Sequence, residues 1–326
     1  MRAFGRILGR VLLGVILLGA ALYVFGPYEK VSLTPSASAS DIGADVDAHF
    51  ASREAAFDDL TPGVAKRVVW HREAGQRSPL SILYVHGFSA TSEEIRPVPD
   101  LVAAALNANL VYTRLQGHGR DGAALNEATV QGWADDLSEA LEVARRVGDE
   151  VVVISTSTGS TLVAGMAEQS ANMADVKGLI FVSPNFGINN PAAALLTWPA
   201  ARYWVSLVAG AERSFEPSND AHGTYWTTRY PTTAVLQMAA LVKDVFAMDH
   251  SKSALPALFW FSEDDKVVDA SKTKEVAARW GGVATVAIQN LGPDADPGAH
   301  VIAGDIMSPG ETQKAVEGFV NFIKSL

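Results

Sequence analysis

The sequence feature that most constrains the fold is an unbroken run of strand-forming residues in the middle of the chain, Val151–Ser155 (VVVIS). Such runs are typical of strands covered on both faces within a parallel sheet. Six similar runs alternate with segments that have helical spacing of apolar residues: 65–72, 80–86, 110–114, 178–183, 257–261 and 284–288. This alternation predicts an α/β fold with a mostly parallel twisted sheet and helices on both faces. Ligand sites of such sheets lie at the carboxyl ends of the strands.

Composition and periodicity divide the chain into five segments. We expect a membrane anchor or signal segment at 1–28, a tether and pre-domain helix at 29–62, a core at 63–184, a helical cap at 185–254, and the second part of the core at 255–326. Nine of the chain's 27 aromatic residues lie in the cap segment. We expect most of them to form the cap's own core, with the wall of an apolar substrate pocket as the alternative.

The first residues have the pattern of a membrane-targeting segment. Arg2, Arg6 and Arg10 precede an apolar run without a polar face, Val11–Phe25. The run has a length between that of a signal-peptide core and that of a membrane span. We expect an uncleaved anchor whose basic end stays in the cytoplasm, with the body exported to the periplasm or outer face. The alternatives are secretion after signal cleavage, for which Ala37–Ala39 has a suitable form, and a buried N-terminal helix.

Charge and cysteine content exclude several classes of function. The net charge is −10, and the first 26 residues hold three arginines and no acid, so the remainder has 23 basic against 36 acidic residues. A body this acidic repels phosphate backbones, and we expect no nucleic-acid partner. The chain has no cysteine, which excludes disulfides, thiolate metal sites and cysteine nucleophiles.

The central strand leads into a turn that carries a candidate nucleophile. Val151–Ser155 is followed by Thr-Ser-Thr-Gly and then by a helix predicted over Thr161–Ser170. This strand–turn–helix resembles the nucleophile elbow of α/β-hydrolases, whose pattern is G-x-S-x-G. The resemblance implies that Ser157 is the nucleophile. Gly159 fits the pattern, whereas Ser155 stands where glycine is usual, and the alternative role of Ser157 is to cap the helix.

Two later loops match the other catalytic positions that the resemblance implies. Asp265 follows the apolar run 257–261 and precedes a Val-Val step, as the acid of the family does, with Asp264 and Glu263 as alternatives. His300 lies between the last strand-like run and the last helix, where the family has its general base. The order Ser157, Asp265, His300 is that of α/β-hydrolases. The last helix is expected to begin with a capping box, Ser-Pro-Gly-Glu, at 308–311.

The resemblance also implies an oxyanion hole formed by the backbone N–H groups of Phe88 and Thr158. Phe88 belongs to a His-Gly-Phe loop after the strand at 80–86, and we expect a structural role for His86. The loop Gly117–Gly122 is similar to a Gly-His-Gly loop of the family, in which His118 would be structural. It also matches G-x-G-x-x-G, but it follows a later strand, which disfavours a dinucleotide site.

Over about residues 63–326 the chain resembles capped bacterial hydrolases of the monoglyceride-lipase and serine-aminopeptidase type. The resemblance predicts a serine hydrolase that cleaves carboxylic esters with apolar or lipid-derived acyl groups, without metal or cofactor. Its expected partners are a small-molecule ester or lipid substrate and the membrane. Alternatives are an amidase, thioesterase or carbon–carbon hydrolase with the same triad, or a non-catalytic ligand-binding protein on this fold.

Overall fold

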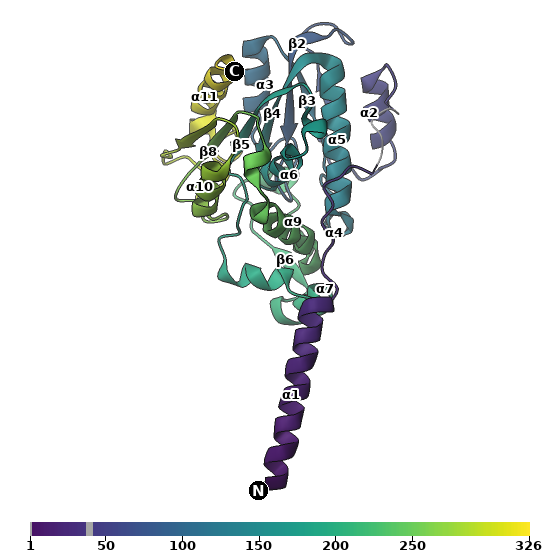
Figure 1. Ribbon diagram of the computed structural model, residues 1–326. Coiled ribbons are helices and arrows are strands. Elements are labelled where there is room, and N and C mark those ends of the chain that lie inside the picture. The colour runs from purple at the N-terminus through teal and green to yellow at the C-terminus, as the bar shows by residue number, and fades with distance from the viewer. Residues whose placement is uncertain (1, 37–41) are drawn as a thin grey trace.

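The centre of the computed structural model, which describes residues 2–36 and 42–326, is a seven-stranded sheet (Figure 1). Its strands are β1 Arg67–Val69, β2 Ser78–Val85, β3 Asn109–Tyr112, β4 Gly148–Thr156, β5 Val176–Val182, β8 Ala257–Phe261 and β9 Ala284–Ile288. The order is β1-β3-β2-β4-β5-β8-β9, and only β1 runs antiparallel to its neighbour. Each strand-like run of the sequence forms one of these strands, so the predicted α/β fold is confirmed.

Helices cover both faces of the sheet because side chains alternate along each strand. In β2, Ile82 and Tyr84 join the core on one face, and Leu83 and Val85 join the core on the other. The first face is covered by α3 (Val98–Leu106) and α11 (Thr312–Lys324). The second face is covered by α5 (Val130–Val147), α6 (Ser157–Ala167) and α10 (Ala270–Arg279).

The pre-domain helix α2 (Val46–Glu54) is shorter than the expected helix at 45–60. Through Phe50 it packs onto the core on the second face of the sheet. The side chain of Asp45 caps it by accepting a hydrogen bond from the Ala48 N–H at 2.9 Å. The short helix α4 (Gly122–Glu127) follows β3. Helix α2 packs beside β1, whereas α4 packs beside residues 229–234.

The segment 185–254, for which we keep the name cap, lies below the sheet in Figure 1 and carries α7 (Ala201–Ala209), α8 (Asp220–Tyr225) and α9 (Val235–Ala247). It also contains a hairpin of β6 (Glu212–Ser214) and β7 (Arg229–Pro231), where the sequence analysis expected helices alone. Strands of three residues are too short to leave a periodic signal. Helix α9 packs on α6, so the cap covers the carboxyl ends of the central strands.

The expected cap core of aromatic side chains is only partly present. Trp226 is buried, and Phe215 and Tyr225 pack with it, but all three join the core on the first face of the sheet. Trp198 and Tyr203 are exposed to solvent. The prediction that most of the aromatic residues form the cap's own core is therefore only partly met. Among the described residues nothing covers Trp198, which precedes α7, or Tyr203 on the outer side of that helix.

Helix α1 (Arg2–Phe25) projects from the body beside the cap (Figure 1). Its apolar stretch Phe4–Phe25 has 22 residues and is exposed along its length, which contradicts the alternative of a buried N-terminal helix. At about 1.5 Å per residue it is about 33 Å long, enough to cross the hydrocarbon core of a bilayer.

The tether after α1 packs partly on the body. The buried Leu33 lies against α6, where a Cβ on Gly165 would come within 2.7 Å of it. The possible cleavage site at residues 37–39 lies outside the described residues.

Candidate active site

Ser157 stands at the junction of β4 and α6, where the strand turns into the helix without an intervening loop. Its backbone φ is 50°, in the left-handed region that is strained for residues other than glycine. The helix begins at Ser157 itself, earlier than the Thr161 expected from the sequence. Glycine is required at position 159, because a Cβ there would lie 2.4 Å from the carbonyl oxygen of His86.

Ser155, which stands where α/β-hydrolases usually have glycine, fits into the crossing of β4 and α6. Its buried hydroxyl lies 3.1 Å from the Oγ of Ser160 and 3.3 Å from the carbonyl oxygen of Ile180. Ser160 in turn donates to the Ser155 carbonyl at 2.8 Å. The extra hydroxymethyl group therefore ties the helix to the strand.

The structure brings Ser157, His300 and Asp265 into one hydrogen-bonded line. His300 Nε2 lies 3.0 Å from Ser157 Oγ, and His300 Nδ1 lies 2.8 Å from Asp265 Oδ2. All three side chains are buried, and each follows a different strand of the sheet: β4, β9 and β8, respectively. An imidazole between a hydroxyl and a carboxylate can accept the hydroxyl proton and be stabilised in its charged form.

Of the three neighbouring acids after β8, only Asp265 reaches the imidazole. Its Oδ1 accepts hydrogen bonds from the N–H groups of Val267 at 2.8 Å and Val268 at 2.9 Å, which leaves Oδ2 for His300. Asp264 is exposed, and Glu263 forms an ion pair with Lys274 on the surface. The Val-Val step thus orients the carboxylate through its two backbone N–H groups.

The environment of His300 favours its charged form. Burial by itself lowers the pKa of the imidazole, but the charge of Asp265 and the hydrogen bond to it outweigh burial and raise the pKa above the ordinary 6.5. Glu94 and Asp296 add smaller contributions in the same direction. The site therefore stabilises the imidazolium that proton transfer from Ser157 would create.

Asp296 and Ser308 hold the loop of His300, and sequence reasoning missed both roles. The Oδ2 of Asp296 accepts from the N–H groups of His300 at 3.1 Å and Val301 at 3.0 Å. Ser308 Oγ accepts from the Asp296 N–H and donates to the Val301 carbonyl. The predicted capping box is therefore wrong: Ser308 binds this loop, and Glu311 accepts from the Gly292 N–H instead.

Glu94 is a third residue that the sequence did not single out, since it follows another glutamate in what reads as a surface turn. Its buried Oε2 accepts from the Gly87 N–H at 2.7 Å and from the Tyr84 hydroxyl at 2.9 Å. A Cβ on Gly87 would lie 2.7 Å from Glu94 Oε1 and 3.1 Å from Ser157 Cβ. Gly87 thus lies between Glu94 and the candidate nucleophile, where there is no room for a side chain.

Burial raises the pKa of Glu94 from 4.5 to about 7, although hydrogen bonds from Gly87 and Tyr84 oppose the shift. This carboxyl group therefore changes charge near neutral pH, next to the loop that carries Phe88.

Phe88 itself is half-buried, and its ring packs edge-on against His118 and Tyr230, with centroids 5.8 and 5.6 Å apart. His86 lies behind this loop and accepts from the Leu115 N–H at 3.1 Å through Nε2. Burial lowers the pKa of His86 well below 6.5 and that of His118 to about 4, so both rings are neutral. Their contacts are those of structural residues.

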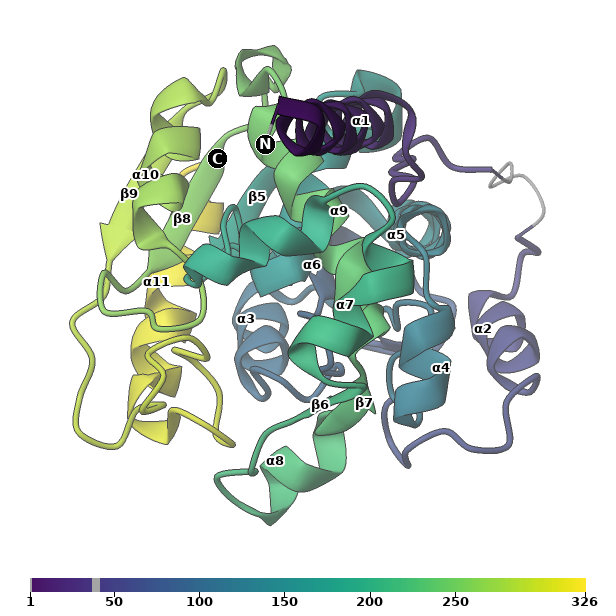
Figure 2. The ribbon, with the colours of Figure 1, turned by 90° about the horizontal axis from the view of Figure 1, so that it is seen from below.

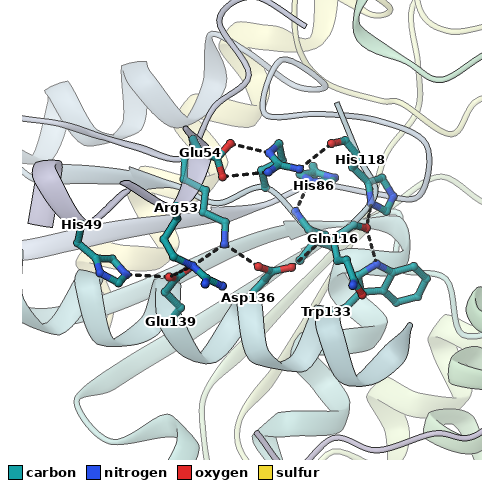
Figure 3. Close-up of polar contacts among 12 residues, drawn as sticks. His49, Arg53, Glu54, His86, Gln116, His118, Trp133, Asp136 and Glu139 are labelled. Carbon is teal, nitrogen blue, oxygen red and sulfur yellow. Dashed lines mark hydrogen bonds and ion pairs between the residues drawn. The ribbon is translucent and has the colours of Figure 1, made fainter. Parts of the chain in front are cut away.

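A buried ionic network joins α2 to the segment after β3 that carries Gln116 (Figure 3). Lys66 Nζ contacts Asp136 Oδ1 at 2.6 Å and Glu139 Oε2 at 2.5 Å, and His49 of α2 contacts the other oxygen of Glu139 at 2.7 Å. Asp136 also accepts from the N–H of Gln116, next to the chain that His86 binds. The pre-domain helix is therefore joined to the walls of the site through charged side chains.

Comparisons with known proteins match this fold. Residues 77–289 match the family described as serine aminopeptidase, S33. A thermostable monoacylglycerol lipase from Bacillus sp. (strain H-257) is 24% identical over 193 residues, which are 59% of this chain and 73% of the relative.

Two solved structures show the same fold at low identity. A metagenome-derived lipolytic enzyme from a study of LipS and LipT has a TM-score of 0.67 at 19% identity, covering 82% of this chain and 100% of its own. A soluble variant of the Saccharomyces cerevisiae monoglyceride lipase, in complex with a substrate analogue, has a TM-score of 0.58 at 12% identity, covering 80% and 89%. The chain, with its predicted hydrolase fold and the family match over most of its length, belongs to the serine aminopeptidase S33 family of α/β-hydrolases.

Proposed function

We propose that the protein is a serine hydrolase that cleaves carboxylic esters through an acyl-serine intermediate. Ser157 is the nucleophile, His300 the general base and acid, and Asp265 the carboxylate that orients and stabilises the imidazole. The observation that carries this proposal is the line of contacts of 3.0 Å from Ser157 to His300 and 2.8 Å from His300 to Asp265. A non-catalytic binding protein has no need of this line.

The reaction proceeds in two halves. Ser157 Oγ attacks the ester carbonyl carbon while its proton passes to His300 Nε2, which forms a C–O bond and a tetrahedral oxyanion. Collapse of this intermediate breaks the bond to the alcohol, which leaves with the proton from His300. A water molecule then transfers a proton to His300 and attacks the acyl carbon, and collapse releases the acid and returns the proton to Ser157.

The backbone N–H groups of Phe88 and Thr158 stabilise the oxyanion in this proposal. Thr158 lies in the first turn of α6, where N–H groups have no acceptor within the helix. Phe88 follows Gly87, which lies against Ser157. Loss of one such donor costs about 3 to 4 kcal/mol of transition-state stabilisation in well-studied hydrolases.

The proposed substrates are esters with an apolar or lipid-derived acyl group. The relative from Bacillus is a monoacylglycerol lipase, and the apolar helix α1 would keep the enzyme at a membrane. Turnover of nitrophenyl esters of rising chain length measures the acyl preference. Faster turnover of amides or short thioesters than of every ester would favour an amidase or thioesterase instead.

The proposed location is the outer side of a membrane, with α1 as an uncleaved anchor. The arginines before the apolar run favour a cytoplasmic N-terminus and an exported body. Secretion after signal cleavage is the alternative.

Labelling of the full-length protein with a fluorophosphonate probe tests the proposal directly. We expect labelling of the wild type and of Ser160→Ala, and none of Ser157→Ala, because only the hydroxyl next to His300 is activated. Ser160 is the matched control, since it lies on the same helix with its hydroxyl bound to Ser155. Absence of labelling in the folded wild type would favour the binding protein.

A further inference from the structure

The cap carries an apolar surface that no other part of residues 2–36 and 42–326 covers. Four large side chains form it, Trp198 with 56% of its surface exposed, Tyr203 with 75%, Leu207 with 86% and Val208 with 70%, and we name these residues the apolar cap face. Tyr203 and Leu207 lie one turn apart on the outer side of α7, whereas Ala201 and Val205 on the other side are buried with Leu236. Val208 is exposed near the end of the helix. A helix that covers a soluble protein normally has polar residues on its outer side. An apolar outer side marks a surface that another phase or molecule covers.

The apolar cap face is fixed to the end of α1. The Ala200 N–H donates to the Pro27 carbonyl at 2.7 Å, two residues after α1 ends. Arg202 forms a bidentate ion pair with Glu29 at 2.9 and 2.7 Å, and Gln237 of α9 contacts the same carboxylate. The contacts of Ala200 and Arg202 lie just before Tyr203 in the chain, and they join the apolar cap face to the segment that leaves α1.

Residues 26–29 join α1 to the cap, and their close packing leaves α1 little freedom to move relative to the cap. A Cβ on Gly26 would lie 2.5 Å from the Cβ of Pro199, and the Lys243 ammonium lies 5.7 Å from the centre of the Tyr28 ring. Figure 1 shows α7 at the height at which α1 meets the body, and in Figure 2, which looks up from below, α7 faces the viewer. The face is therefore turned to the side from which α1 projects.

We propose that the apolar cap face lies in the lipid–water interface of the leaflet in which α1 ends, so that anchor and cap hold the body on the bilayer as one unit. The proposal rests on the membrane anchor proposed above. If α1 spans a bilayer, its last residue lies at a membrane surface, and the joint at residues 26–29 puts α7 at the same level. Tryptophan and tyrosine prefer this level, and leucine and valine enter the acyl boundary just below it.

This arrangement places the cap between the bilayer and the candidate nucleophile. Met238 of α9 contacts the side chain of Asn185 at 3.5 Å, and Asn185 lies next to Thr158 behind Ser157. A second copy of the chain or a soluble partner on this face would make the position of the face at the end of α1 a coincidence.

A single-cysteine probe in the full-length chain tests the proposal, since the natural sequence has no cysteine. Leu207→Cys and Val283→Cys are labelled with an environment-sensitive fluorophore and reconstituted in phosphatidylcholine vesicles with and without lipids brominated in the acyl chain. Val283 is the matched control: it is 71% exposed and precedes β9, at the edge of the sheet opposite to the cap. We expect the probe at 207 to lose about half of its emission to the brominated lipid, and the probe at 283 to lose almost none.

The possible results distinguish a failure of the proposed cap docking from a failure of the proposed membrane anchor. Equal emission of both probes with and without brominated lipid, in protein that floats with the vesicles, would overturn the docking of the cap and leave the anchor intact. Protein that does not float with the vesicles would instead refute the anchor. Quenching that requires two labelled copies in one vesicle, and vanishes on dilution with unlabelled lipid, would indicate a dimer contact and also overturn docking.

A functional measurement provides an independent readout. Leu207→Glu is expected to lower turnover of a long-chain ester embedded in vesicles about tenfold and to leave turnover of soluble nitrophenyl butyrate unchanged. Val283→Glu should change neither rate. An equal loss on both substrates in Leu207→Glu would point to damage of the cap and contradict the proposal. Inactivity of the wild type on every ester would refute the proposed function, while the fluorescence result would stand by itself.

Discussion

At the scale of residues, the site depends on side chains that hold others in place. Asp265 has its carboxylate fixed by two backbone N–H groups, Asp296 fixes the loop of His300, and Glu94 fixes Gly87 beside Ser157. None of the three would touch substrate in the proposed mechanism. Their removal is therefore expected to show in pH dependence as well as in rate.

Asp265→Asn tests the role of the carboxylate. We expect kcat/KM to fall about 10³- to 10⁴-fold, because the amide cannot stabilise the imidazolium. In the wild type, activity is lost as the pH falls through the pKa of His300, since a protonated imidazole cannot accept the proton of Ser157. Asp265 raises that pKa, so the residual activity of the variant should be lost at lower pH than in the wild type. The exposed neighbour provides the control: a similar loss in Asp264→Asn would mean that the acid has been misassigned.

Glu94→Gln tests the buried carboxyl group through stability. The folded-state pKa of about 7 exceeds the ordinary carboxyl value of 4.5, so Glu94 stabilises the fold fully below pH 4.5 and loses this contribution as the pH rises to 7. The difference corresponds to about 3 kcal/mol. Urea unfolding of the full-length protein in detergent should show this fall for the wild type and not for Glu94→Gln. The exposed Glu127→Gln should follow the wild type, and parallel curves for all three proteins would show that Glu94 is not perturbed.

At the scale of elements, α2 and the elbow differ in how they are held. The elbow is fixed by the local crossing of β4 and α6. Helix α2 is held by Phe50 in the core and by the contacts of His49 and Arg53 with Glu139 of α5. Buried charges stabilise a structure only while they are paired, so this junction is vulnerable to the loss of one partner.

Lys66→Met removes the cation between Asp136 and Glu139 and leaves two carboxylates partly buried. We expect the free energy of unfolding to fall by about 3 kcal/mol, measured by urea denaturation of the full-length chain in detergent. Lys252→Met is the matched control, because Lys252 makes only an exposed contact of 4.0 Å with Asp249, and its effect should stay within about 0.5 kcal/mol. A loss of equal size in both variants would show that the buried network contributes nothing of its own.

At the scale of the whole molecule, the position of α1 beside the cap suggests that anchoring and access to the site are linked. The acidic body has no attraction to anionic lipid as a whole, with 23 basic and 36 acidic residues after position 26. The proposed attachment to a membrane therefore depends on apolar surface, which α1 and the apolar cap face would supply.

The anchor predicts the outcome of extraction from membranes. The full-length chain should remain in the pellet after alkaline carbonate washing, with the intact mass of an uncleaved protein. Leu12→Asp/Leu17→Asp should pass into the soluble fraction, since each charge inside the bilayer costs about 3 kcal/mol. The same change at the exposed positions Val283 and Val286 should have no effect on extraction. A soluble wild type that lacks the first segment would instead identify a cleaved signal.

The sequence by itself determined the seven strands and the fold. A strand that is buried on both faces is a continuous run of apolar residues, and such a run can be recognised from the sequence alone. It also placed Ser157, Asp265 and His300 in the order of the family. The tertiary structure decided what arises between distant segments: that Asp265 rather than Asp264 meets His300, that Ser308 binds the His300 loop instead of capping a helix, and that Glu94 lies behind Gly87. The exposure of the outer face of α7 was likewise decided by the tertiary structure. The partner of a polar side chain and the exposure of an apolar one depend on which distant segments lie nearby. The periodicity of residues along one segment does not contain this information.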